Sequence, residues 1–547
     1  MATSLEPTST LSKESWLGSR ADLAAVVGIL LGLVARLWTA SGTFLNPDEA
    51  LHFRLANQLS LALAYKQSLT SAHPPLLIVL LYYWRALGTS ELWLRLPSIL
   101  TSLIFCWMFY KWLTKAVGRL AGIVGLLFVA LLPPIVVLGA EIRQYDLLLA
   151  FLAGALYFLD EAFGENSPGR MAGFCLCLYL AMLSHYSAFV FAAALGVYAL
   201  LRIREERPPA RLVAAWVVGQ VGGLALAILL YRTHLSQLGG SESKSALHGW
   251  ESEIYLRHSY FERGHDNPLI FLVSHTFAVF QYIFGQLAVG DAMGVLFVVG
   301  VVLLLRGKDF PGNRNSGRRL GIFLLLPFAM AGAASLGRLY PYSGTRHVAY
   351  LIIPGLAAVS VAIVRLAAGS WRRALAISGV ILAVSIALGK GRPPRMERAD
   401  QNRAHMTAAL GFIQQNVKPS DLIFTDYQTD LILGHYLCDQ RPIAFESAPA
   451  GFEQFSCAGH RVVSTQYRIW RFWADNFAKE WPQFAQDYGL KPGDTVWVLQ
   501  SGWGVSLPED LKQHRPEFRD LRYQAFGANV KIFKVDVGET MAAASRK

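Results

Sequence analysis

Charged residues are scarce in this chain of 547 residues, because only 16% are Asp, Glu, Lys or Arg, whereas 53% are apolar. Soluble domains average about 25% charged residues, so the composition argues against a soluble protein built around a single core. The apolar residues come in blocks, and several blocks reach the roughly 20 residues that a helix needs to cross a hydrocarbon core. The sequence therefore predicts a polytopic α-helical membrane protein.

Cysteine is also rare, with five residues in the whole chain. Cys106, Cys175 and Cys177 lie in apolar segments, where we expect inert thiols, and no zinc-binding spacing is present. Cys438 and Cys457 lie in the more polar C-terminal part. If that part lies in an oxidising compartment, a disulfide between these two residues is expected.

Acids are fewer than bases, and the formal net charge is +12. The Lys and Arg residues cluster in short loops between apolar blocks, which is the pattern of cytoplasmic loops in membrane proteins. No basic and aromatic surface motif typical of nucleic-acid binding is found. We therefore predict no nucleic-acid partner and assign the positive charge to membrane orientation.

About eleven apolar segments qualify as membrane spans. The first is too long for the apolar part of a signal peptide and is not followed by a typical cleavage site, so we expect it to remain in the protein. The predicted spans are residues 21–40, 93–113, 120–139, 146–162, 170–184, 187–203, 211–231, 289–305, 319–337, 348–366 and 373–389.

Four basic loops orient these spans. They fall on one side of the membrane if the chain alternates from a cytoplasmic N-terminus, and they comprise residues 111–119, 202–211, 306–319 and 365–373. This assignment requires that residues 76–88 form a juxtamembrane helix, because a further span there would invert every later side. Residues 268–288 are expected to be interfacial or re-entrant.

The predicted domains are a cytoplasmic tail (1–20), a transmembrane catalytic domain (21–389) and an extracytoplasmic α/β domain (390–547). In the last of these, charge density rises and apolar runs shorten. It contains no Gly-rich phosphate loop and no catalytic-triad signature. Its expected strands are 421–427, 461–465, 494–500 and 529–535, and its expected helices are 398–416 and 468–489.

Polar groups gather on the side opposite the basic loops. Ionisable residues at membrane depth cost about 2.5–3.5 kcal/mol on insertion scales, so they suggest function by default. A carboxylate can act as a general base toward an acceptor hydroxyl or amine, and cations can bind a departing phosphate. A sugar carried on a polyprenyl phosphate would meet both kinds of group at the membrane surface.

Six motifs in order carry a family resemblance: "NPDEALHF", "HPPLL", "GTSELWLRLPSIL", "LGAEIRQYDLLLAFL", "LSHYS" and "GTRHVAYLIIPGLAA". Over residues 20–360, approximately, the chain resembles the GT-C glycosyltransferases. It is most similar to bacterial relatives of the protein O-mannosyltransferases (glycosyltransferase family 39-like). These relatives include aminoarabinose and galacturonic acid transferases that modify lipid A or core sugars.

The resemblance implies an inverting transferase that uses a polyprenyl-phosphate-linked sugar on the extracytoplasmic face of the inner (plasma) membrane. The acceptor would be a lipid, a glycan or a protein, and membrane lipids would surround the enzyme. Asp48 matches the acid proposed as general base, Glu49 completes an acidic pair, and Asp146 occupies the acid position of the second outward loop. Glu49 could alternatively serve only the helix dipole, and either aspartate could be a helix N-cap.

The same resemblance assigns cations to the donor. Arg143 matches the Arg of an R-x-Y signature, and Arg346 and His347 lie in a late loop where relatives place a phosphate-binding cation. His73 departs from the aminoarabinose transferases, which have Lys before the Pro. His carries its charge less securely than Lys at neutral pH.

Two alternatives stay open. No cofactor is certain, although a divalent metal is conceivable on these loops; no fixed ligand spacing supports one. A lipid or glycolipid transporter or flippase is the rival function, and it predicts ionisable residues at mid-membrane and broken helices. The clustering of the acids at one surface favours the enzyme.

Overall fold

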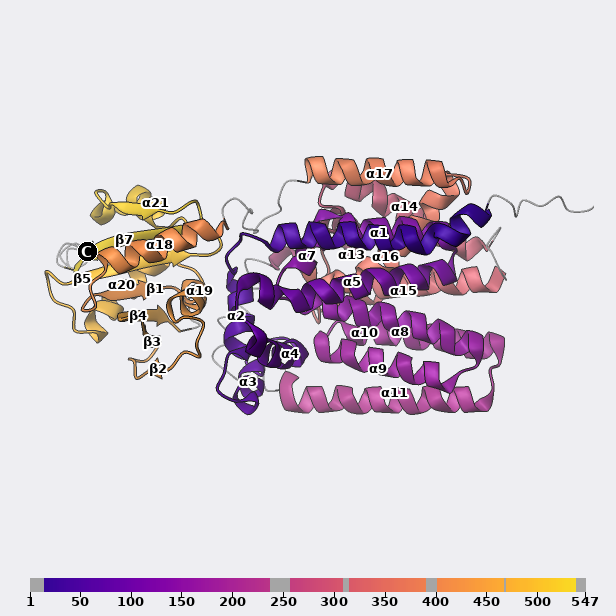
Figure 1. The fold of residues 1–547 in the computed structure, drawn as a ribbon, viewed down its shortest axis with the longest axis horizontal. Coiled ribbons are helices and arrows are strands. Elements are labelled where there is room, and N and C mark those ends of the chain that lie inside the picture. Colours follow the sequence, from indigo (N-terminus) through magenta and orange to yellow (C-terminus); the bar gives the residue numbers. More distant parts are fainter. Residues whose placement is uncertain (1–13, 237–255, 308–313, 390–400, 467–468, 538–547) are drawn as a thin grey trace, which may run out of the picture. The chain divides into compact units, whose positions relative to one another are not determined.

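The computed structural model describes residues 14–236, 256–307, 314–389, 401–466 and 469–537 (Figure 1). The chain divides into two compact units. The first comprises residues 1–38, 96–231 and 256–390, and the second comprises residues 39–95, 232–255 and 391–547. Most of the predicted cytoplasmic tail and parts of the loops 232–268 and 306–319 lie outside the described residues.

The first unit is a bundle of helices, and each of the eleven predicted spans lies on one helix or on one pair of consecutive helices. The elements are α1 (Glu14–Ala40), α5 (Glu91–Ala116), α6 (Arg119–Leu131), α7 (Pro133–Ala140), α8 (Tyr145–Glu165), α9 (Pro168–Ser184), α10 (Ala188–Glu206), α11 (Ala210–Leu230), η6 (Arg257–Ser259), α13 (Pro268–Phe284), α14 (Leu287–Arg306), α15 (Arg314–Leu336), η7 (Arg346–Leu351), α16 (Ile352–Leu366) and α17 (Trp371–Leu388). The short η3 (Tyr231–Leu235) follows α11, and all but its first residue belong to the second unit.

Among the described residues, eight helices are long and apolar enough to cross a membrane, or nine if the bent pair α6–α7 counts as one span. Two predicted spans do not meet this test. α9 is only 17 residues long, and α10 ends in a charged stretch, "RIREE". The protein is a multi-pass membrane protein.

Burial separates the centre of the bundle from its rim. In α8, 72% of the apolar window is buried, whereas in α11 only 11% is buried. α11 packs on α9 through glycines: a Cβ added at Gly219 would lie 2.2 Å from the sulfur of Cys175, and one added at Gly222 would lie 2.3 Å from the hydroxyl of Tyr179. The rest of α11 presents Val and Leu side chains outward, as a lipid-facing helix does.

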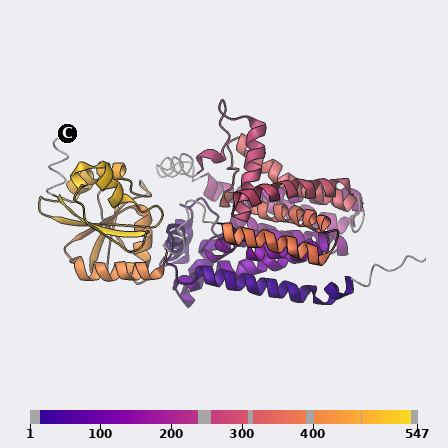
Figure 2. The ribbon, with the colours of Figure 1, turned by 90° about the horizontal axis from the view of Figure 1, so that it is seen from above.

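Two features interrupt the parallel packing. α6 and α7 meet at a bend of 60°, at consecutive prolines Pro133 and Pro134 that cannot donate backbone hydrogen bonds. Figure 2 shows α13 running across the direction of its neighbours in the bundle. α13 is also too short to be counted as a span, so its geometry agrees with the expectation of an interfacial segment.

Ion pairs at one end of the bundle join residues of three of the four basic loops, 111–119, 202–211 and 306–319. Arg202 Nη1 lies 2.6 Å from Asp160 Oδ1, and Arg319 Nη1 lies 2.7 Å from Glu205 Oε2. Lys115 pairs with Glu161. These contacts join the ends of α5, α8, α10 and α15, as the common side predicted for the basic loops requires.

The second unit contains the segment after α1 and the C-terminal domain. The segment forms α2 (Pro47–Ala56), α3 (Leu61–Ser68), α4 (Leu76–Trp84) and η2 (Arg85–Leu87). The sequence placed this segment within 21–389, whereas its contacts group it with the C-terminal domain. The short α4 lies where we expected a juxtamembrane helix rather than a span.

The C-terminal domain is built on one seven-stranded mixed sheet of order β2-β3-β4-β1-β5-β7-β6. β1 pairs in parallel with β4 and β5. The elements are α18 (Arg403–Asn416), β1 (Leu422–Thr425), α19 (Tyr427–Leu437), β2 (Phe445–Glu446), β3 (Phe452–Cys457), β4 (His460–Thr465), α20 (Ala474–Asp487), β5 (Thr495–Ser501), α21 (Leu507–His514), η8 (Pro516–Phe518), β6 (Tyr523–Ala525) and β7 (Val530–Asp536).

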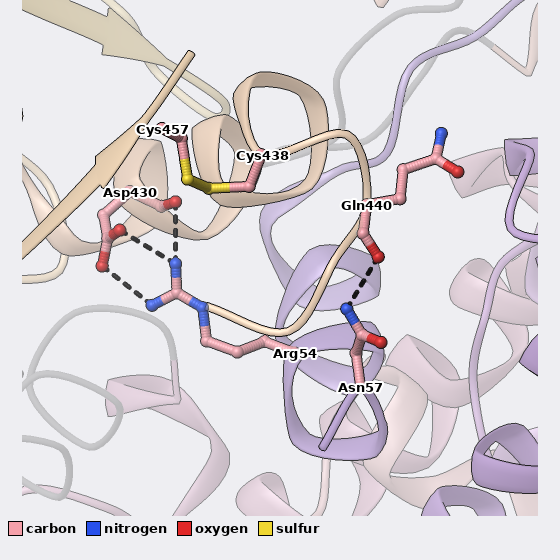
Figure 3. The surroundings of a disulfide bond; sticks show 6 residues. All are labelled: Arg54, Asn57, Asp430, Cys438, Gln440 and Cys457. Carbon is pink, nitrogen blue, oxygen red and sulfur yellow. Dashed lines mark hydrogen bonds and ion pairs between the residues drawn. A yellow bond between two sulfur atoms is a disulfide. The ribbon is translucent and has the colours of Figure 1, made fainter. Parts of the chain in front are cut away.

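All four expected strands and both expected helices of this domain are present, and its core is aromatic. Phe424 of β1 stacks on Phe484 of α20, with ring centroids 4.0 Å apart. The expected disulfide is confirmed, since Cys438 and Cys457 are bonded with their Cα atoms 4.9 Å apart (Figure 3). The sequence interpretation missed α19, α21 and the strands β2, β3 and β6.

Candidate active site

Asp48 lies in the first turn of α2. The N-cap of this helix is Asn46, whose side chain accepts a hydrogen bond from the backbone N–H of Glu49, and Pro47 occupies the first helical position. Asp48 is therefore not the N-cap, which removes the structural alternative considered for it. Its side chain is buried to 9% exposure, in the turn where the helix dipole favours negative charge.

Glu49 makes two structural interactions through its carboxylate. Its carboxylate accepts from the backbone N–H of Asn46, which completes the capping box. Both oxygens also accept from Arg95, at 2.7 Å from Nε and 2.7 Å from Nη2. Arg95 in turn donates to the carbonyl oxygens of Ala40 and Phe44, so the Glu49–Arg95 pair fixes the entry of the chain into α2.

His73 lies near Asp48 through one intervening residue. His52 Nδ1 is 2.6 Å from the carbonyl oxygen of Asp48, and the rings of His52 and His73 are stacked with centroids 6.1 Å apart. The second unit thus has Asp48 and Glu49 in the first turn of α2 and His73 beside His52 of the same helix.

Asp146 lies in the first turn of α8 in the first unit. The N-cap is Gln144, which makes no side-chain capping hydrogen bond, so Asp146 is not a cap either. It is fully buried, and within the described residues neither carboxylate oxygen has a hydrogen-bond partner. Arg36 and Glu141 are its charged neighbours. Buried polar atoms are normally satisfied, so this carboxylate suggests a ligand-binding or proton-transfer role.

Gln144 shares this property, and the sequence interpretation did not select it. Its side chain is fully buried, and neither its amide nitrogen nor its amide oxygen has a hydrogen-bond partner among the described residues. An amide of this kind has no charge or motif to mark it. Only its position between Arg143 and Asp146 in "EIRQYD" could have drawn attention to it.

Arg36 donates hydrogen bonds to backbone carbonyls at the break between α6 and α7. Its guanidinium donates to the carbonyl oxygens of Val129 and Ala130, at 3.1 and 2.9 Å. In an unbroken helix these carbonyls would accept from residues 133 and 134, which are prolines without N–H groups. Arg36 therefore stabilises the bend and also supplies positive charge beside Asp146.

The cations of the late loop lie near those of the second outward loop. Arg143, His185 and Arg346 are all close enough to His347 to act on its charge. Arg143 is buried and its Nε lies 3.9 Å from Glu141 Oε2. The hydroxyl of Tyr340 donates to the carbonyl oxygen of His347 at 2.8 Å. The first unit thus brings Arg143, Asp146, Arg346 and His347 to one end of the bundle.

His185, at the junction of α9 and α10, is a neutral member of this group. Burial lowers the pKa of its imidazole to about 3. Its Nδ1 lies 2.8 Å from the Ser187 hydroxyl, and its ring lies 5.3 Å from that of Tyr145. His185 therefore offers hydrogen bonds rather than charge.

The predicted residues form two groups, one in each unit. The expectation that Asp48 and Asp146 share one cavity stays a prediction. Over the residues that the structure describes, no three His, Cys, Asp or Glu side chains are grouped so that they could hold a metal ion.

Comparisons with known proteins support the resemblance. Residues 72–231 match the family described as dolichyl-phosphate-mannose-protein mannosyltransferase. ArnT from Cupriavidus metallidurans, solved bound to undecaprenyl phosphate, aligns with a TM-score of 0.51 and 13% identity, over 94% of this chain and 98% of that chain. The chain therefore has the fold of this ArnT.

The apo state of the same ArnT aligns with a TM-score of 0.50 and 13% identity, over 97% of this chain and 99% of ArnT. The oligosaccharyltransferase of Archaeoglobus fulgidus, tethered to an acceptor peptide, aligns with a TM-score of 0.49 and 11% identity, over 89% of this chain and 70% of that chain. No curated protein sequence matches this chain significantly.

Proposed function

We propose that this protein is a GT-C glycosyltransferase that moves a sugar from a polyprenyl-phosphate donor to a lipid, glycan or protein acceptor. The observation that carries the proposal is the ArnT fold, which extends over 94% of the chain and includes both the helical bundle and the C-terminal domain. The matched ArnT was solved with undecaprenyl phosphate bound, which is the leaving group that our proposal requires.

Asp48 is the general base of the proposed reaction. It takes the proton from an acceptor hydroxyl or amine. The acceptor atom bonds to the anomeric carbon of the sugar while the bond from that carbon to the phosphate oxygen breaks. The bonding electrons leave with the polyprenyl phosphate, and the configuration at the anomeric carbon inverts.

The cations stabilise the charge that develops on this phosphate. Arg143 and Arg346 have the planar, always-charged guanidinium groups that suit phosphate oxygens. His347 of the late loop and His73, which lies between α3 and α4, add hydrogen bonds to the phosphate. Asp146 and Gln144 bind the donor's sugar or orient the acceptor. Glu49 acts indirectly, because its pairing with Arg95 fixes α2.

The positive charge of the loops supports an extracytoplasmic site in the inner (plasma) membrane. The basic ends of α5, α10, α14 and α16 face the cytoplasm by the positive-inside rule. The acids at the starts of α2 and α8 and the C-terminal domain then face the opposite side.

The proposal is tested by comparing envelopes with and without this protein. Mass spectrometry of glycolipids and glycoproteins should show one class of molecule that loses a single sugar when the protein is absent. Purified protein incubated with a panel of undecaprenyl-phosphate monosaccharides should release undecaprenyl phosphate only when the acceptor is supplied. Unchanged envelopes and an inert panel would together contradict the proposal.

One observation favours the rival function of lipid transport. The 60° break between α6 and α7 resembles the broken helices that line transporter sites. Here, however, Arg36 occupies the carbonyl groups that the break exposes. A transporter would move a labelled undecaprenyl-phosphate sugar across proteoliposomes without separating the sugar from its lipid.

A further inference from the structure

α2 is too short to set its own position. It has ten residues, and isolated helices below about 12–15 residues are marginal in water. Its location, and with it the location of Asp48, must therefore come from tertiary contacts. The C-terminal domain supplies such contacts at both ends of the helix.

The N-terminal end of α2 is held by backbone and side-chain hydrogen bonds. The backbone N–H of Leu45 donates to the hydroxyl of Tyr436 at 2.9 Å, and the backbone N–H of Phe44 donates to the carbonyl of Gln401 at 3.0 Å. The Tyr436 hydroxyl also donates to Glu91 Oε1 at 3.0 Å. One phenol of α19 therefore joins the entry of α2 to the start of α5.

The C-terminal end of α2 is held by a buried ion pair. Arg54 Nη1 and Nη2 donate to the two carboxylate oxygens of Asp430 at 2.8 and 2.9 Å, and Nη2 also donates to the Asp430 carbonyl at 2.8 Å (Figure 3). The Asp430 side chain is fully buried and that of Arg54 is 12% exposed. A bidentate pair of this kind fixes geometry as well as charge.

The disulfide supports the next contact. It joins Cys438, directly after α19, to Cys457 at the end of β3. The turn that follows includes Gln440, whose carbonyl accepts from Asn57 Nδ2 at 3.0 Å (Figure 3). The backbone φ of Gln440 is 60°, which is uncommon for a residue other than glycine. A flexible turn would rarely keep this conformation.

α2 also lies at the edge of the sheet where α/β proteins usually bind ligands. In such sheets the crevice is outside the carboxyl ends of parallel strands, here β1, β4 and β5. Gly502, directly after β5, lies so close to α2 that an added Cβ would be 2.9 Å from the Pro47 ring. In this chain, the first turn of α2 lies at the position where other α/β proteins bind their ligands.

We propose that the C-terminal domain holds α2 at both ends and thereby sets the position of Asp48. Arg54, Asp430 and Tyr436 are then positioning residues for sugar transfer, and this consequence rests on the proposed function. The inference gives the C-terminal domain a task in the reaction although it has no phosphate loop or catalytic triad of its own.

Hydrogen–deuterium exchange of the full-length protein tests the contact without any substrate. Asp430→Asn removes the charge that pairs with Arg54, and Tyr436→Phe removes only a hydroxyl. Peptides within residues 43–57 should exchange about tenfold faster in either variant, because exchange reports local opening. Asp475→Asn and Tyr523→Phe are matched controls, since they remove an exposed ion pair and a hydroxyl contact elsewhere in the domain.

Kinetics test the consequence, with the undecaprenyl-phosphate monosaccharide on which the wild type is active as probe. The Tyr436→Phe variant should lose roughly 10- to 100-fold in kcat, since misplacing a catalytic group by about 1 Å can cost 10²-fold. The donor KM should stay within about twofold.

Unchanged exchange in residues 43–57 would overturn the inference. Faster exchange with a wild-type kcat would overturn it too, because α2 would then be held without being positioned for catalysis. If the wild type is inert toward every donor, the proposed function fails, and the exchange result alone still decides whether the domain holds α2.

Discussion

Asp48 and Asp146 occupy equivalent places in two unrelated helices. Each is the second residue of its helix, two positions after the N-cap. A carboxylate in the first turn of a helix lies where the helix dipole favours negative charge. Neither aspartate is the N-cap of its helix, so neither side chain is needed to start the helix.

Replacing Asp48 by Asn should separate catalysis from folding. Asn46 remains as the N-cap, so the variant should insert and unfold at the wild-type temperature. Loss of a general base typically costs about 10²–10⁴ in rate, and transfer should fall by that amount in an assay of released undecaprenyl phosphate. Asp475→Asn serves as the control for a surface carboxylate. Transfer at the wild-type rate would make Asp48 a structural residue.

The residue types of the site could be predicted from the order of the motifs, but their partners could not. Glu49 was expected in catalysis, and its pairing with Arg95 joins residues 46 positions apart. Arg54 and Asp430 are 376 positions apart. Periodicity describes neighbours along the chain, and it says nothing about which distant charges meet. Gln144 escaped notice because an uncharged amide gives no pattern.

At the scale of the element, the break between α6 and α7 depends on one side chain from a third helix. Pro133 and Pro134 deprive two carbonyls of partners, and Arg36 provides the missing donors. Breaks in membrane helices persist only where neighbouring groups satisfy the freed backbone. Arg36 lies within the first predicted span, where a charge is costly, and these hydrogen bonds give the reason for its presence.

Arg36→Met should lower thermal stability because it leaves the Val129 and Ala130 carbonyls unsatisfied. The expected loss is about 2 kcal/mol, since an unsatisfied buried group costs about 1–3 kcal/mol. Adding Pro133→Ala restores an N–H for the Val129 carbonyl, so the double variant should recover part of the loss in thermal unfolding of detergent-solubilised protein. A double variant no more stable than Arg36→Met would refute this account of the break.

The sequence analysis did not predict the helix α19. Its N-cap is Asp426, whose carboxylate accepts from the backbone N–H of Thr429, so the sequence "DYQTD" did contain a capping signal. The helix follows a four-residue strand directly, and its buried face mixes Asp430 and His435 with apolar side chains. A helix buried through polar side chains has no clear apolar stripe, which explains why periodicity missed it.

His435 of α19 should make the contact with α2 sensitive to acid. Burial, together with the charges of Arg95 and Arg403, lowers the pKa of His435 from 6.5 to about 3. The ring lies edge-on to Phe53 of α2, with centroids 4.8 Å apart. Because the folded pKa is depressed, its contribution to stability is present above pH 6.5 and is lost as the pH falls toward 3.

At pH 5 the linkage amounts to about 2 kcal/mol, at 1.36 kcal/mol for each pH unit below 6.5. Exchange in residues 427–437 should therefore accelerate between pH 7 and pH 5 after correction for the intrinsic rate. His435→Phe should flatten this dependence. It loses no hydrogen bond, because neither ring nitrogen has a partner within the described part of the chain. An equal pH dependence in both proteins would exclude His435 as its source.

At the scale of the whole molecule, charge and redox chemistry point to the same orientation. Ion pairs join the basic helix ends within the first unit, and such loops face the cytoplasm. The C-terminal domain contains the disulfide, which persists in oxidising compartments and is rare in the cytosol. Both properties support our proposal that this domain lies on the extracytoplasmic side, where the proposed donor would present its sugar.

Labelling of single cysteines tests this orientation directly. Arg372→Cys lies in the basic stretch 365–373, in the first turn of α17, and Asp475→Cys lies in the C-terminal domain at a side chain that is 91% exposed. A membrane-impermeant maleimide should label the Asp475→Cys protein in intact cells whose outer envelope has been opened, and the Arg372→Cys protein only after lysis. Each variant is its partner's control, because both residues are charged and solvent-facing. Labelling of both before lysis would contradict the topology of the basic loops. Labelling of the Asp475→Cys protein only after lysis would contradict the extracytoplasmic site, since Asp48 and the C-terminal domain belong to one compact unit.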